Sequence, residues 1–196
     1  RHKRCVSSLK AMGPGSTFHR VLWDDADPVK KNQGEISHTE MTLKPDNEIR
    51  RVVLCTGKVY YDLFEERAKR GITDVSFLRL EQIYPFPDGP LRKQLSRFPQ
   101  AEVVWCQEEP ENQGAWHFVD RRIEGVLSAV NGVAKRPVYV GRPAAASPAE
   151  ASPAAASPAG ASPAGASPAA ACPAFRALAA AHCPAVFQGS ARKSDG

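Results

Sequence analysis

The chain has 196 residues, with 26 Lys and Arg against 21 Asp and Glu and a formal net charge of +5. The charges are interspersed and form no basic stripe with interleaved aromatic residues, so the composition argues against a nucleic-acid-binding protein. No run of about 18 apolar residues occurs, so no membrane-spanning helix is predicted.

The cysteines and the first residues bear on the cellular compartment and the extent of the chain. The five Cys match no disulfide framework and no CxxC zinc pair, which favours a reducing compartment, either the bacterial cytoplasm or the mitochondrial matrix. Cys55 and Cys106 each close an apolar run and are expected to be buried as small hydrophobic side chains. The chain opens RHKRCVSSLK, without Met or an apolar signal segment, and is expected to be a fragment.

Residues 1–50 show no regular pattern and are predicted to be an irregular lead-in segment that packs on the following domain. Residues 13–25, GPGSTFHRVLWDD, begin with turn-forming residues and then become apolar, as is typical of an extended segment. Residues 27–48 are polar and are predicted to lie on the surface.

A strand and a helix are predicted next. Residues 51–57 are an apolar, β-branched run typical of a strand buried on both faces. Residues 58–71 have the spacing of an amphipathic helix, and Gly71 is placed to end it. The apolar face of this helix comprises Val59, Leu63 and Phe64.

The alternation of strand and helix continues to residue 143. Residues 74–87 are predicted as the second strand, and Asp88 as the N-cap of a helix that reaches about Phe98. The later predicted elements are a strand over 101–107, a helix from Trp116 to about Val130, and a strand over 136–141. Parallel strands need long crossovers, so residues 51–143 are predicted to be an α/β domain with a parallel sheet flanked by helices.

Residues 144–196 form a low-complexity tail. From Ala146 the chain contains six tandem copies of a five-residue ASPA-type unit, which has little to bury and is predicted to be disordered. Cys172 stands where the other copies have Ser and is interpreted as a drifted serine. The adjacent pair His182-Cys183 cannot build a zinc site without further ligands.

Three segments are predicted to lie at the carboxyl edge of the sheet, where ligands of open α/β sheets bind. They are Thr56-Gly57-Lys58, Leu80-Glu81-Gln82 and 107–115. Lys58 either holds an anion at the next helix or is simply solvated. No complete active site is found.

The acidic turn at Glu108, Glu109 and Glu111 has two interpretations. A pair of carboxylates can act in acid–base catalysis when a cleft sets their separation. Carboxylates just before a helix are also stabilised by its dipole, and the sequence favours this interpretation.

Several long stretches together resemble one known family. They are RHKRCVSSL, GPGSTFHRVLWDD, RRVVLCTGKVYYDLFEERAKRGITDV, LRLEQIYPFP, EVVWCQEEPENQGAW and YVGRPAAASPA. In this order, over about residues 1–149, they closely resemble the carboxyl-terminal domain of the thiamine-diphosphate-dependent 2-oxoglutarate dehydrogenase component. The resemblance implies the transketolase carboxyl-terminal fold, a parallel α/β sheet.

The resemblance also implies a function for the intact enzyme. That function is the oxidative decarboxylation of 2-oxoglutarate in the tricarboxylic acid cycle, with transfer of the succinyl group to a lipoyl arm. Thiamine diphosphate and Mg²⁺ belong to preceding domains of the family, so no catalytic, cofactor-binding or metal-binding residue is assigned here, and the fragment alone is expected to be inactive. The implied partners are the upstream catalytic domains, a second copy in a homodimer and the dihydrolipoyl succinyltransferase.

The family resemblance also leads to a hypothesis about the carboxyl edge. Some relatives bind a nucleotide or acyl-CoA regulator near such an edge, and a lysine with backbone N–H groups would suit its phosphates. The residues expected to line this interdomain groove are Thr56, Gly57, Lys58, Gln107, Gln113 and Gly114.

Two alternatives stay open on the sequence. One is the carboxyl-terminal domain of another thiamine enzyme, such as the pyruvate dehydrogenase β chain or transketolase. The other is a non-catalytic interaction module that pairs with a separate catalytic chain. The repeats after residue 149 depart from the family pattern and leave open whether the native carboxyl terminus is present.

Overall fold

The computed structural model describes residues 5–6, 9–29, 39–146 and 186. The strands are β1 (Val21–Leu22), β2 (Arg51–Cys55), β3 (Val75–Leu80), β4 (Glu102–Pro110) and β5 (Val138–Arg142). The helices are α2 (Val59–Arg70), α3 (Asp88–Leu95) and α4 (Trp116–Ser128), with 3-10 turns η1 (Leu9–Met12) and η2 (Asp46–Glu48). The predictions for the repeats, Cys172 and His182-Cys183 lie outside the described residues. No helix in the described part is both long and apolar enough to cross a membrane.

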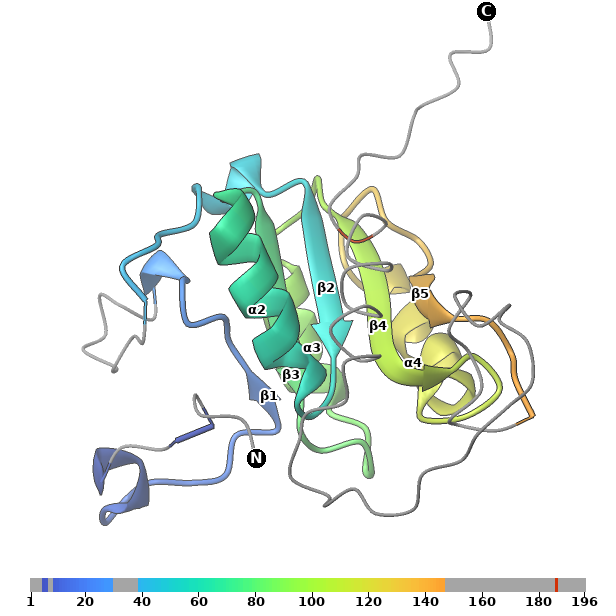
Figure 1. Ribbon diagram of the computed structural model, residues 1–196, viewed down its shortest axis with the longest axis horizontal. Coiled ribbons are helices and arrows are strands. Elements are labelled where there is room, and N and C mark those ends of the chain that lie inside the picture. Colours follow the sequence, from blue (N-terminus) through green and yellow to red (C-terminus); the bar gives the residue numbers. More distant parts are fainter. Residues whose placement is uncertain (1–4, 7–8, 30–38, 147–185, 187–196) are drawn as a thin grey trace, which may run out of the picture.

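The fold is a five-stranded, mostly parallel α/β sheet in the order β1-β3-β2-β4-β5. The pairs β2–β3, β2–β4 and β4–β5 are parallel, and only β1 runs antiparallel to its neighbour β3. Helix α2 covers one face, whereas α3 and α4 contact each other on the opposite face (Figure 1). The predicted α/β fold class is therefore confirmed. The predicted boundaries at residues 50 and 143 stay predictions.

Several element ends differ from the sequence expectations. Strand β3 stops at Leu80 rather than at residue 87, because the backbone N–H groups of Glu81 and Gln82 turn to the carbonyl of Arg20. Strand β4 continues to Pro110, where it pairs with β5 beyond a shift in register. Asp88 is the first residue of α3 and not its N-cap, which is Pro87.

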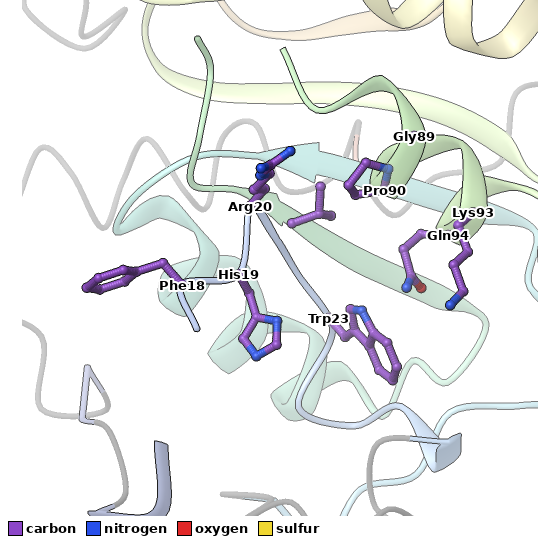
Figure 2. Close-up of a pocket in the computed structure, with 9 residues that line it drawn as sticks. Phe18, His19, Arg20, Trp23, Gly89, Pro90, Lys93 and Gln94 are labelled. Atoms are coloured by element: carbon purple, nitrogen blue, oxygen red, sulfur yellow. The ribbon is translucent and has the colours of Figure 1, made fainter. Parts of the chain in front are cut away.

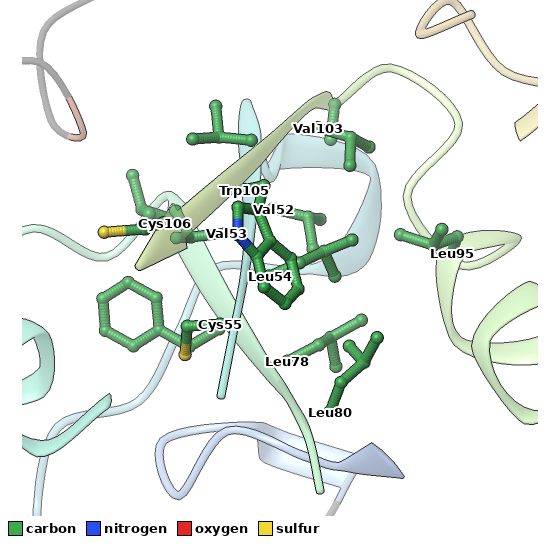
Figure 3. Packing of buried hydrophobic residues seen from close by; sticks show 14 of the residues in the cluster. Val52, Val53, Leu54, Cys55, Leu78, Leu80, Leu95, Val103, Trp105 and Cys106 are labelled. Atoms are coloured by element: carbon green, nitrogen blue, oxygen red, sulfur yellow. The ribbon is translucent and has the colours of Figure 1, made fainter. Parts of the chain in front are cut away.

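The core is built on the central strand. All five residues of β2 are buried, as the uninterrupted apolar run predicts. The fully buried ring of Trp105 from β4 lies beside them (Figure 3). Cys55 and Cys106 are buried thiols in this core, as expected, and burial raises the pKa of Cys55 well above its ordinary value.

Gly71 ends α2, as the sequence predicts. Its φ of 63° is a left-handed conformation that favours glycine.

A buried ion pair fastens the lead-in segment to the sheet and to α2. The side chains of Asp24 and Arg67 are both 0% exposed and form a two-pronged pair, with Arg67 Nη2 2.7 Å from Asp24 Oδ1. The Asp24 carboxylate also accepts the backbone N–H of Phe77 in β3 at 2.8 Å and that of Ala26 at 2.9 Å. The lead-in segment is therefore held by charge as well as by the short strand β1.

Candidate functional site

The candidate site lies where the order of the sheet reverses. Strand β2 is central, with β3 on one side and β4 on the other. The loops that leave the carboxyl ends of β2 and β4 diverge to helices on opposite faces of the sheet. Open α/β sheets bind ligands at such a point. Thr56, Gly57 and Lys58 follow β2, whereas Gln107 lies in β4 and is followed by the loop to α4.

An ion pair joins the two loops. Lys58 Nζ lies 2.9 Å from Oε2 and 3.0 Å from Oε1 of Glu108. The two side chains are 58% and 32% exposed, so water screens the pair and it contributes at most about 1 kcal/mol. Gly57, with a φ of 68°, lets the chain turn from β2 into α2 and places Lys58 at the N-cap. An anion that binds Lys58 must therefore displace the Glu108 carboxylate or share Lys58 with it.

The side-chain amide of Gln107 organises the acidic turn from inside. Its Oε1 accepts the indole N–H of Trp105 and the backbone N–H of Trp116, both at 3.0 Å. Its Nε2 donates to the carbonyl oxygens of Gln113 at 2.8 Å, Pro110 at 3.0 Å and Glu109 at 3.3 Å. Gln107 is 4% exposed, so it positions the loop and does not present its amide to a ligand.

Gly114 and Gln113 complete this turn. Gly114 has a φ of 67°, and a Cβ at this position would lie 3.0 Å from Gln107 Nε2 and 3.1 Å from Glu109 Cβ. Gln113 Nε2 donates to the carbonyl of Ala145 at 3.2 Å. The side-chain amide of Asn112 donates to the carbonyl of Ala145 at 3.1 Å and accepts the backbone N–H of Ala145 at 3.0 Å. The turn is thus anchored to the chain that follows β5.

The helix-dipole interpretation of the acidic turn stays a prediction, and the side chain that binds the start of α4 is a neutral one. The first turn of α4 contains no acidic residue, and the N–H of Trp116 is bound by the neutral amide of Gln107. Glu108 is paired with Lys58.

Tyr139 lies near the acidic turn and keeps its proton. Burial, with the charge of Glu111 adding to it, raises the pKa of Tyr139 to about 12. Its hydroxyl is therefore neutral and donates to the carbonyl of Arg142 at 2.9 Å.

The sequence analysis missed a polar cluster at the end of β3. Arg79 Nη1 donates to the hydroxyl of Tyr61 at 2.8 Å, and Arg79 Nε lies 2.8 Å from Glu81 Oε1. The Arg79 guanidinium also lies 4.7 Å from the ring centre of Tyr60. Burial raises the pKa of Tyr61. Residue alternation along β3 places Arg79 on the same face as Phe77, and this was the available signal.

Comparison with known proteins decides the family. The sequence model described as 2-oxoglutarate dehydrogenase C-terminal matches residues 6–158. The chain belongs to this family. The resemblance drawn from the sequence is thereby confirmed.

Several curated proteins are similar to this chain over three quarters of its length. The 2-oxoglutarate dehydrogenase E1 component of Brucella anthropi is 57% identical over 147 residues, which are 75% of this chain and 14% of the relative. The proteins of the same name from Brucella ovis and Brucella suis are 56% identical over the same length and the same shares. The chain thus spans about one seventh of these relatives, at 14% of their length.

Proposed function

We propose that this chain is the carboxyl-terminal domain of a 2-oxoglutarate dehydrogenase E1 component. The intact enzyme would oxidatively decarboxylate 2-oxoglutarate in the tricarboxylic acid cycle and pass the succinyl group to a lipoyl arm. The observation that carries this proposal is the family match over residues 6–158. The test is a chimera in which residues of this chain replace the matching segment of the Brucella anthropi relative. Retained turnover supports the proposal, whereas a folded but inactive chimera contradicts it.

The cofactors are proposed to bind outside this chain. Thiamine diphosphate supplies the carbanion-stabilising chemistry in such an enzyme, and Mg²⁺ anchors its diphosphate through oxygen ligands. Within residues 5–6, 9–29, 39–146 and 186, no group of three or more His, Cys, Asp and Glu side chains is placed to hold a metal ion. No catalytic step is assigned to the described residues.

The domain itself would supply packing surfaces within a homodimer and against the upstream catalytic domains. Tyr84 is 81% exposed at the carboxyl edge. Its ring centre lies 6.5 Å from that of Phe118, over which the Arg122 guanidinium sits at 3.8 Å. An exposed aromatic patch with an arginine is typical of a contact surface. The dihydrolipoyl succinyltransferase is the proposed acceptor partner, and the bacterial relatives favour the cytoplasm.

The carboxyl edge is further proposed to bind a nucleotide or acyl-CoA effector between this domain and its neighbour. The proposed groove comprises Thr56, Gly57, Lys58, Gln107, Gln113 and Gly114. The Lys58–Glu108 pair spans the loops at the point where the sheet order reverses. A phosphate would replace the Glu108 carboxylate as the partner of Lys58, near the start of α2. Gln107 would act by holding the turn, since its amide is bound by protein groups.

Substitution Lys58→Ala in the chimera tests this effector site, with acetyl-CoA and AMP as probes. The half-maximal concentration of the active probe should rise about tenfold, equivalent to about 1.4 kcal/mol, because one charge-assisted contact is lost. Basal turnover should stay unchanged. Lys69→Ala is the matched control, since Lys69 lies on the same helix and is 68% exposed.

Two outcomes would contradict the effector proposal. One is an unchanged probe response in the Lys58→Ala chimera. The other is an absence of any response to either probe in the unsubstituted chimera at normal turnover.

A further inference from the structure

A groove lies at the opposite side of the sheet from β5, between β1 and the start of α3. It encloses about 400 Å³. We call it the edge groove and define it by Phe18, His19, Arg20, Trp23, Lys93 and Gln94. Figure 2 shows Arg20 beside the first residues of α3, and Trp23 across from Gln94 and Lys93. The residues of the proposed effector groove take no part in it.

The floor of the edge groove is held by contacts within the domain. Arg97 Nη1 donates to Gln94 Oε1 at 3.2 Å, and its guanidinium lies 5.9 Å from the ring centre of Trp23. Arg97 is itself held by the carboxylates of Asp27 at 2.8 Å and Asp46 at 2.9 Å. Gln94 is 6% exposed. A partner would therefore lose little affinity to ordering this floor.

The rim of the edge groove is basic and aromatic. His19, Arg20 and Lys93 line it, and none of its lining residues is Asp or Glu. The nearby carboxylate of Asp24 is paired with the buried Arg67, and those of Asp27 and Asp46 share Arg97. Phe18 extends from the rim with its side chain fully exposed. These features fit a partner that carries both carboxylates and apolar side chains.

The backbone at the edge groove belongs to a short edge strand, β1. Strand β1 is the outermost strand of the sheet in the described residues, with β3 on its inner side only. The carbonyl of Arg20 is turned inward, where it accepts the N–H groups of Glu81 and Gln82. An extended peptide can add to the outer side of such an edge strand through main-chain hydrogen bonds.

We propose that the edge groove binds an extended, acidic peptide segment of a partner protein. The segment lies along β1, its apolar side chains contact Phe18 and Trp23, and its carboxylates face Arg20 and Lys93. The charges set specificity and the rate of association, and the main-chain hydrogen bonds to β1 fix the direction of the segment.

Fluorescence anisotropy with the full chain tests this proposal. The probe is a short fluorescein-labelled peptide of alternating Glu and Val. Lys93→Glu and Arg20→Glu should each weaken binding about tenfold or more, because each introduces like charges next to the peptide. Lys135→Glu is the matched control. Lys135 is an exposed lysine just before β5, at the other end of the sheet, and its substitution should change binding less than about twofold.

A second peptide separates strand addition from attraction by charge alone. The same sequence, N-methylated at every peptide nitrogen, keeps every carboxylate but has no backbone N–H to donate to β1. Its binding should be lost. Two outcomes would overturn the proposal: equal binding of the two peptides, or no effect of the groove substitutions.

Discussion

Replacement of Asp24 by Asn should lower the free energy of unfolding by about 3–5 kcal/mol, the usual cost of removing one partner from a buried ion pair. The loss leaves the Arg67 guanidinium fully buried without its carboxylate, since both side chains are 0% exposed. It also weakens the bond that the backbone N–H of Phe77 donates to Asp24. Urea unfolding of the full chain, followed by circular dichroism, measures the change.

The matched control for this substitution is Asp74→Asn. Asp74 accepts a hydrogen bond from Arg50 Nε at 2.9 Å, but the two side chains are 30% and 33% exposed. Water can replace the lost partner there, so the cost should stay below about 1 kcal/mol. Equal losses for the two variants would show that the burial of the Asp24–Arg67 pair is energetically unimportant.

Replacement of Gln107 by Ala should lower the free energy of unfolding by about 3 kcal/mol, because buried groups without hydrogen-bond partners cost about 1–3 kcal/mol each. The indole N–H of Trp105 and the first N–H of α4 lose their acceptor, and three carbonyl oxygens of the acidic turn lose their donor. The isosteric change Gln107→Glu should also be destabilising, since it places a carboxylate against those carbonyls.

Gln113→Ala serves as the comparison for Gln107→Ala. The side-chain amide of Gln113 donates one described bond, to the carbonyl of Ala145 at 3.2 Å, at a half-buried position. Its loss should cost about 1 kcal/mol or less in the same urea experiment. A Gln107→Ala variant as stable as Gln113→Ala would contradict the structural role given to Gln107.

The fold could be predicted from the sequence because its signals are local. The uninterrupted apolar run of β2 indicates a strand buried on both faces, and Gly71 marks the end of α2. The strand order follows less directly, and the antiparallel pairing of β1 was not predicted. It depends on contacts between segments almost 60 positions apart, such as Val21 with Leu80.

The polar contacts could not be predicted because a sequence does not distinguish a charged residue that will be buried from one that will lie on the surface. Asp24 and Arg67 are 43 positions apart, and nothing in the residues around them marks the pair. Lys58 and Glu108 are 50 positions apart, and they meet only because β2 and β4 are neighbours. The sequence predicted that both loops lie at the carboxyl edge of the sheet, but it did not predict the ion pair between Lys58 and Glu108.

The acidic turn illustrates the difference between composition and geometry. From the sequence, the three glutamates within residues 108–111 could be interpreted either as catalytic carboxylates or as charges stabilised by the dipole of the next helix. In the structure, the neutral Gln107 performs the capping, and Glu108 pairs across the sheet with Lys58. The turn is therefore a structural connection that brings a charged pair to the carboxyl edge.

The most direct test of the proposed function is to measure 2-oxoglutarate-dependent CO₂ release by the Brucella anthropi chimera and by the chain alone, with thiamine diphosphate and Mg²⁺ added to both. The matching segment comprises 147 residues at 57% identity. We expect the chimera to turn over 2-oxoglutarate at a rate comparable to the relative, and the chain alone to show no turnover. A folded chimera without activity, or robust turnover by the chain alone, would contradict the proposal that this chain is a non-catalytic domain of that enzyme.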